Sequence, residues 1–157
     1  MPKKEPIDGM SATWSLRRGT LHDATAMKAC LTTAYAEAAA KLSDLPPMAD
    51  GITDDITNKE AWVADQDGTV VGVLVLEPRA EVLVIANVAV AASQQGQGLG
   101  RGLFEFATQE AKRRGLGQLR LSTHAGMVET VALYRRTGWV EIGRAGNTIT
   151  MAKPVNR

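Results

Sequence analysis

The chain has 157 residues, of which 45% are hydrophobic, and 18 basic against 17 acidic residues leave a net charge of +1. This length suffices for one domain with its own core, and the balanced charge gives no reason to expect nucleic acid or an anionic membrane as a partner. The single cysteine, Cys30, excludes an internal disulfide. The sequence has neither a run of ~18 apolar residues nor an N-terminal apolar signal core, so we expect a cytoplasmic protein.

The chain opens with a polar stretch and then a strand and a helix. Residues 1–12 contain two prolines and a glycine, which predicts a flexible tail ahead of a single domain over residues 13–157. Residues 13–18 alternate between apolar and polar, as a strand does. A helix capped by Thr20 or Asp23 should then run to about Ala40.

A connector over residues 42–55 follows, in which prolines, a glycine and four aspartates break regular structure. It is either a solvated linker or a lid over a binding site. Residues 53–59 favour a short helix. The next stretch predicts a hairpin around Asp67-Gly68, with Gly72 marking a bulge or a close backbone approach.

The remaining expected elements continue to the end of the chain. Glu77-Pro78-Arg79 should turn the chain into a buried strand rich in β-branched residues. The predicted ranges of the remaining elements are 82–90 (strand), 99–111 (helix), 119–123 (strand), 126–136 (helix), and 139–142 with 147–152 (terminal hairpin).

The turn after strand 82–90 carries alternating glycines and opens a helix. Such a turn points unpaired backbone N–H groups and the positive end of the helix dipole at one spot, which is a seat for phosphate. The spacing does not fit a dinucleotide fingerprint, because Arg101 and Leu103 stand where the last glycine would be, and no G-K-[ST] follows for a Walker loop. A ligand-free glycine loop is the alternative.

The spacing Gln95-x-x-Gly98-x-Gly100 resembles the signature of the GNAT superfamily of acyl-CoA-dependent N-acyltransferases. The segment 133–139, L-Y-R-R-T-G-W, resembles a second family motif with tryptophan in place of phenylalanine, and the element order matches over residues 13–152. The resemblance implies an α/β (α+β) fold, with a central, mixed, mostly antiparallel sheet of six to seven twisted strands flanked by about four helices.

The resemblance also implies acetyl-CoA as co-substrate and no metal. The pyrophosphate would lie on the amides of the glycine turn, and the pantetheine arm would pair with the strand edge before it. The residues expected to bind the cofactor are Val88, Ala89, Val90, Gln95, Gly96, Gln97, Gly98, Leu99, Gly100, Arg101 and Tyr134.

By its motif position Tyr134 is expected to be the general acid for the departing thiolate, although a tyrosine at this helical spacing can also be a core residue. For the general base the candidates are His124, which can also be a solvent-facing loop histidine, and Asn87 through a water chain. The family often has asparagine where this chain has Met127.

Tyr35, Met48 and Asn87 are the expected substrate-binding residues, and the acidic connector favours a cationic small amine. The resulting hypothesis is acetyl transfer to a primary amine of a small molecule by direct attack in a ternary complex. A CoA-binding regulatory module without turnover and a partner-binding domain are the alternatives. The edge of the terminal hairpin 139–152 also suggests a homodimer.

Overall fold

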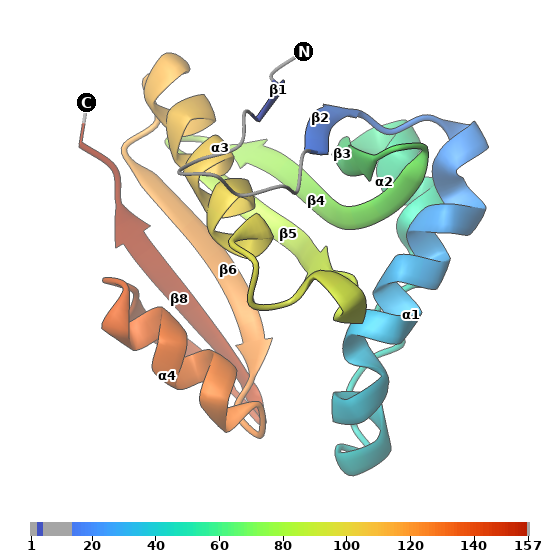
Figure 1. Ribbon diagram of the computed structural model, residues 1–157. Coiled ribbons are helices and arrows are strands. Elements are labelled where there is room, and N and C mark those ends of the chain that lie inside the picture. The colour runs from blue at the N-terminus through green and yellow to red at the C-terminus, as the bar shows by residue number, and fades with distance from the viewer. Residues whose placement is uncertain (1–2, 5–13, 157) are drawn as a thin grey trace.

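The computed structural model describes residues 3–4 and 14–156. Within them one eight-stranded sheet has the order β1-β2-β3-β4-β5-β6-β8-β7 (Figure 1). Only β5 and β6 run parallel, and every other neighbouring pair is antiparallel, which confirms the predicted mixed sheet. The strand number is eight rather than the predicted six to seven, because the two-residue β1 pairs with β2. The strands are β1 (Lys3–Lys4), β2 (Trp14–Arg18), β3 (Glu60–Gln66), β4 (Thr69–Arg79), β5 (Val82–Val90), β6 (Gln118–His124), β7 (Val140–Ala145) and β8 (Thr148–Pro154).

Four α-helices and two short 3-10 helices complete the described part of the chain. They are η1 (Leu21–Asp23), α1 (Ala24–Lys41), α2 (Ile52–Asn58), η2 (Ala92–Gln94), α3 (Leu99–Arg113) and α4 (Val128–Arg136). No helix in these residues has the length and apolar character that crossing a membrane requires.

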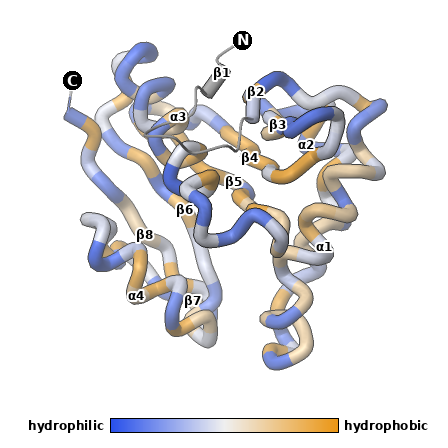
Figure 2. The backbone as a smooth tube through the Cα atoms, in the orientation of Figure 1, coloured by the Kyte–Doolittle hydropathy of each residue, from blue (hydrophilic) through white to orange (hydrophobic). Residues whose placement is uncertain are grey.

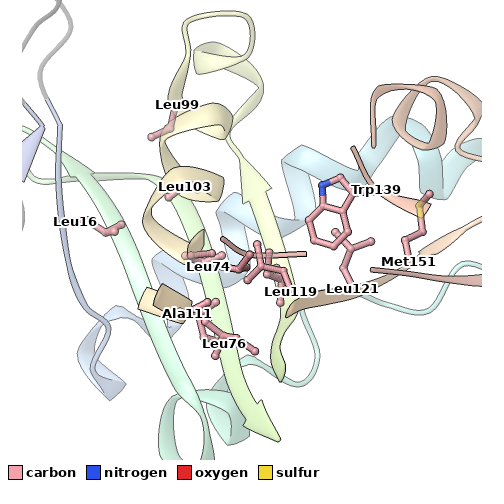
Figure 3. Close-up of a cluster of buried hydrophobic side chains, with 14 of the residues drawn as sticks. Leu16, Leu74, Leu76, Leu99, Leu103, Ala111, Leu119, Leu121, Trp139 and Met151 are labelled. Atoms are coloured by element: carbon pink, nitrogen blue, oxygen red, sulfur yellow. The ribbon is translucent and has the colours of Figure 1, made fainter. Parts of the chain in front are cut away.

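The helices cover the two faces of the sheet and so create two cores. Residues of α1 and α2, among them the buried Met27, Leu31 and Ile52, pack on one face. Leu103 of α3 and Val131 of α4 belong to the core on the other face, part of which Figure 3 shows. The most hydrophobic segments lie in the central strands β4 and β5, between the two layers (Figure 2).

The 3-10 turn η1, which leads into α1, is held by a partly buried charge pair, whereas Asp23 as the N-cap residue of α1 makes no side-chain capping bond to that helix. The Asp23 carboxylate accepts a hydrogen bond from the backbone N–H of Thr20 at 2.8 Å and two from the Arg17 guanidinium at 2.9 Å each. These bonds, mainly those from Arg17, lower the pKa of Asp23 to about 2. Cys30 is buried in this helix, and burial raises the pKa of its thiol to about 11, as expected of a core cysteine.

A register shift in β5 decides which way its side chains face. Val75 of β4 pairs with Asn87, but the next residue, Leu76, pairs with Ile85, so Ala86 is an extra residue. Such a bulge reverses the alternation of side chains between the two faces. Ile85 therefore joins the core under α3, whereas Ala89 joins the core under α1.

Beyond its first residues β5 separates from β6, which Figure 1 shows as a widening gap between the two strands. The two strands are paired only between residues 82–84 and 118–120. β6 then continues alongside β8 to His124. The backbone of Val88 and Val90 is therefore not paired with β6.

Several boundaries differ from the predictions. The predicted turn at Glu77-Pro78-Arg79 is wrong, because β4 extends to Arg79 and Pro78 lies opposite Leu83 in the ladder; the turn is made by Ala80 and Glu81 instead. Of the predicted tail 1–12, only Lys3–Lys4 are among the described residues, and they pair with β2. The strand most completely buried is β4 rather than β5.

Candidate active site

The glycine turn has the backbone geometry that a phosphate seat needs. Gly96 and Gly98 have φ angles of 81° and 86°, which only glycine adopts readily. Gly98 is the N-cap of α3, and its carbonyl accepts from Gly102 N–H at 3.0 Å. The first N–H groups of this 15-residue helix have no partner within the helix and lie at the end of β5.

A cavity of about 440 Å³ runs between α3 and α4. Gly100 and Arg101 line it near the turn, and Leu133, Tyr134 and Thr137 line it from α4. Its floor comes from Leu119 of β6 and its far wall from Lys153 of β8. A molecule held at the start of α3 can therefore extend along the two helices.

A second cavity, of about 370 Å³, lies between the connector, β5, the end of β6 and α4. The site residues predicted from sequence that the structure brings together here are Tyr35, Met48, Asn87, Val88, His124 and Tyr134. These residues come from separate parts of the chain. Their meeting around one cavity is what the predicted substrate site requires.

Tyr134 lines both cavities, so it lies between them. Its ring packs edge-on against Phe104, with ring centres 5.7 Å apart, and in a tilted arrangement against Trp139 at 5.9 Å. Burial and the neighbouring Tyr35 hydroxyl raise the pKa of Tyr134 well above that of a free tyrosine. Its hydroxyl therefore keeps its proton at neutral pH.

Asn87 is the one buried polar residue among the described residues, with 9% of its surface exposed. Its amide nitrogen donates to the backbone carbonyl of Met48 at 3.2 Å, which ties β5 to the connector. Its Oδ1 is buried and has no hydrogen-bond partner. An unpaired buried acceptor destabilises a fold by ~1–3 kcal/mol, so this oxygen is available to accept a hydrogen bond from a bound molecule.

Both ring nitrogens of His124 are engaged. Nε2 lies 2.7 Å from Asp44 Oδ1, and Nδ1 accepts from the backbone N–H of Gly126 at 2.8 Å. Since Nδ1 is the acceptor, the neutral ring carries its proton on Nε2 and donates it to Asp44. Asp44 also accepts from Asn147 Nδ2 at 2.8 Å. We name Asp44, His124 and Asn147 the clamp, because they hold the connector to the β6–β8 half.

Two side chains contact the strand edge where the pantetheine arm is expected. The Tyr35 hydroxyl donates to the carbonyl of Val88 at 2.9 Å, and the Gln95 amide donates to that of Val90 at 3.2 Å. These carbonyls therefore point away from β4. In this structure Gln95 braces the glycine turn against the end of β5.

Comparison with known proteins establishes the family. The model of the acetyltransferase (GNAT) family matches residues 27–139, which is more than half of the chain. This chain belongs to the GNAT acetyltransferase family. Among curated GNAT-type relatives, the [ribosomal protein bS18]-alanine N-acetyltransferase of Escherichia coli K12 is 32% identical over 76 residues, 48% of this chain and 51% of the relative. The chain thus matches about half the length of that relative.

Solved structures show the same fold. The PaiA N-acetyltransferase of Thermoplasma acidophilum, in complex with coenzyme A, has a TM-score of 0.80 at 16% identity and covers 92% of this chain and 99% of its own. The ribosomal-protein-S18-alanine N-acetyltransferase of Escherichia coli has a TM-score of 0.74 at 21% identity, with coverage of 92% and 95%. The GNAT fold class predicted from sequence is thereby confirmed.

Sequence reasoning missed the clamp partners Asp44 and Asn147. Asp44 was one of several connector aspartates, and it lies 80 positions before His124 in the chain, so no local pattern connects the two. Two other acidic groups of this region form ion pairs elsewhere: Glu37 with Lys41 and Asp55 with Lys59. Among the described residues, no group of three or more His, Cys, Asp or Glu side chains could hold a metal ion.

Proposed function

We propose that this GNAT protein transfers the acetyl group of acetyl-CoA to a primary amine by direct attack in a ternary complex. One observation carries the proposal: Tyr134 lines both the cavity at the start of α3 and the cavity lined by Asn87. A donor and an acceptor bound in these two spaces would meet at one hydroxyl. Holding the two reactants together in this way is itself a large part of catalysis.

On the donor side, the residues present fit coenzyme A. The N–H groups at the start of α3 would hold the pyrophosphate, and Gly100, which carries no side chain, leaves the wall of the first cavity open. The backbone of Val88 and Val90 would pair with the amides of the pantetheine arm, as an added strand does. A backbone N–H near Val88 would polarise the thioester carbonyl.

The chemical step balances with the groups present. The neutral amine nitrogen attacks the thioester carbon, the C–S bond breaks, and the Tyr134 hydroxyl gives its proton to the departing sulfur. The acetylated nitrogen loses its surplus proton to solvent, from which Tyr134 regains one. Asn87 would hold the acceptor nitrogen, with Tyr35 and Met48 at its sides.

For the acceptor, our proposal remains a small-molecule amine. The relative from Escherichia coli that acts on a ribosomal protein makes a protein amine the competing choice. The acidic connector supports a cationic small amine less than its composition suggests, because Asp44 is the only acidic side chain that lines the second cavity.

The test is release of free thiol from acetyl-CoA in the presence of a panel of amines, with mass spectrometry of the products. We expect thiol release that depends on an amine and an acceptor heavier by one acetyl group. Tight CoA binding without amine-dependent release for any acceptor would instead identify a CoA-binding regulatory module. The engagement of both His124 nitrogens favours that alternative, so the assay is decisive.

We further propose a homodimer formed through the sheet edge at β7. This strand ends the sheet, and its Val140 and Ile142 are 58% and 48% exposed. The charge of Glu141 is neutralised by ion pairs with Arg135 and Arg144, which weakens its protection of the edge. Light scattering should give twice the monomer mass at micromolar concentration, and Ile142→Lys should restore the monomer.

A further inference from the structure

The second cavity contains no side chain that is free to act as a base. Its titratable lining residues come from the connector, β6, α1 and α4, and they are Asp44, His124, Tyr35 and Tyr134. Asp44 and His124 are hydrogen-bonded to each other, and Gly126 N–H occupies the second ring nitrogen. Burial raises the pKa of Tyr35 to about 12 and that of Tyr134 further. An ammonium bound here would find no group ready to take its proton.

The walls of this cavity are also nearly uncharged. Its lining, all of it among the described residues, contains no lysine, arginine or glutamate, and Asp44 is its only carboxylate. That carboxylate lies at the rim, 54% exposed, and is shared between His124 and Asn147. A polyamine would therefore have no separate anion for each of its charges, whereas a molecule with one amine and an uncharged body fits.

Asn87 supplies a buried amide to this lining, with 9% of its surface exposed. Asn87 Oδ1 has no partner, and an amide oxygen accepts a hydrogen bond from an N–H but does not take up a proton at neutral pH. The Asn87 amide oxygen therefore suits an amine that binds in its neutral form. The acceptor must then have a weakly basic nitrogen, because the enzyme does not deprotonate it.

From these walls we infer that the acceptor is a weakly basic α-amine on a small uncharged residue, that is, the amino group of a small aminoacyl amide. The start of a polypeptide carries the same group and is the competing source. The inference rests on the proposed acetyl transfer and narrows its acceptor. An α-amino group has a reference pKa of about 7.7–8.0, against about 10.4 for a lysine side chain. At neutral pH a substantial fraction of α-amines is therefore uncharged, but almost no lysine side chains are.

A matched pair of amines tests this inference. Alaninamide offers an α-amine, and Nα-acetyl-lysinamide offers only a side-chain amine. At pH 7.5 kcat/KM should be higher for alaninamide by on the order of 10²-fold, the ratio of the neutral fractions. Its kcat/KM should level off above about pH 8, whereas that of the lysine compound should still rise at pH 9. A tetrapeptide beginning with alanine, run in parallel, tells a polypeptide end from a free aminoacyl amide.

Three results would overturn the inference. A preference for the lysine amine or for spermidine would show that the cavity accepts strong bases. Profiles for both amines that break at one common pH between 6 and 7 would reveal a base in the enzyme, such as His124 released from its bonds. If acetyl-CoA binds but no amine is acetylated, the lysine compound and spermidine included, the proposed transfer itself fails. A wrong choice of acceptor class would instead leave the strong bases acetylated.

Substitution of Asn87 provides a second, independent test of the inference. Asn87→Asp places a carboxylate at the amine, which attracts a cation and can take its proton, so the preference for alaninamide should shrink at least tenfold. Asn156→Asp makes the same chemical change at an exposed position near the C-terminus and should leave the preference unchanged. An unchanged preference in a folded Asn87→Asp protein would contradict the role of Asn87. Should that variant not fold, the wild-type ratio and pH profiles still decide.

Discussion

The proposed donor side and the proposed acceptor side of this site are built in opposite ways. The glycine turn and the start of α3 come from a continuous stretch, Gln95 to Arg101, which follows β5 and the short η2. The acceptor cavity draws Tyr35, Met48, Asn87, His124 and Asn147 from five separate segments. The difference teaches that a phosphate-binding site formed by backbone N–H groups can be predicted from one motif, whereas a cavity lined by side chains depends on the whole fold.

The largest effect is expected where the two sides meet. Tyr134→Phe keeps the ring against Phe104 and Trp139 and removes only the acid, so kcat should fall by roughly 10²–10⁴-fold. Affinity for acetyl-CoA should change little, since the phosphate and pantetheine contacts remain. Stopped-flow turnover and calorimetry measure the two quantities. A purely structural tyrosine would instead lower the melting temperature while kcat stayed at the wild-type value.

CoA binding on the proposed donor side can be weakened without changing the acceptor side. Gly100 has an ordinary helical backbone, and an added Cβ would meet only Val90 Cγ2, at 3.6 Å, so Gly100→Val should fold. Its side chain would enter the first cavity at the phosphate seat and weaken CoA binding by ~2–4 kcal/mol, as calorimetry can measure. Gly98 is a less clean target because its φ of 86° strains any larger residue. Gly143→Val, in open space on β7, is the control and should bind CoA normally.

The framework under both sides depends on the pair Arg17–Asp23. Because the pKa of Asp23 is lowered from 3.8 to about 2, its contribution is present above about pH 4 and is lost as the pH falls through 2. Asp23→Asn should therefore reduce unfolding free energy by about 2 kcal/mol at pH 7 and by much less at pH 2. Urea denaturation at the two pH values measures this. Glu37→Gln, which removes an exposed pair of the same helix, should change it by under ~0.5 kcal/mol.

The smallest effect is expected from loosening the acceptor side. Asp44→Ala removes both bonds that the connector makes to His124 and Asn147, so the amine KM should rise several-fold while CoA affinity stays unchanged. Asp50→Ala, an exposed aspartate of the same connector, should leave both values as they are. Equal losses on the two sides would show that the clamp supports the whole domain rather than the acceptor cavity. Steady-state kinetics with the best acceptor and calorimetry with CoA give the comparison.

Local sequence patterns predicted the elements that lie next to one another in the chain. The range of β5 was predicted without error, and the buried face of α3 follows the expected positions Leu99, Leu103, Ala107 and Ala111. Gly96 and Gly98 do adopt the left-handed backbone that the motif requires. These features depend on periodicity and on the conformational range of glycine, which a sequence displays directly.

Pairing between distant strands could not be read in the same way. The bulge at Ala86 depends on the register that β4 imposes, and it turns Asn87 towards the connector, where its amide reaches Met48. Pro78 was expected to end β4, but it lies opposite Leu83 within the ladder. Only the assembled sheet decides such positions, because a single extra residue reverses every side chain beyond it.

The sequence by itself determined the donor half of this protein: the strand, the glycine turn and the helix that follow one another between residues 82 and 113. Tertiary structure alone decided that both His124 nitrogens are occupied, that one connector aspartate closes the clamp, and that Asn87 keeps an unpaired oxygen. The physical reason is the separation along the sequence between the residues that determine each feature. Backbone conformation follows from neighbouring residues, whereas hydrogen bonds between side chains depend on partners that only folding brings within 3 Å.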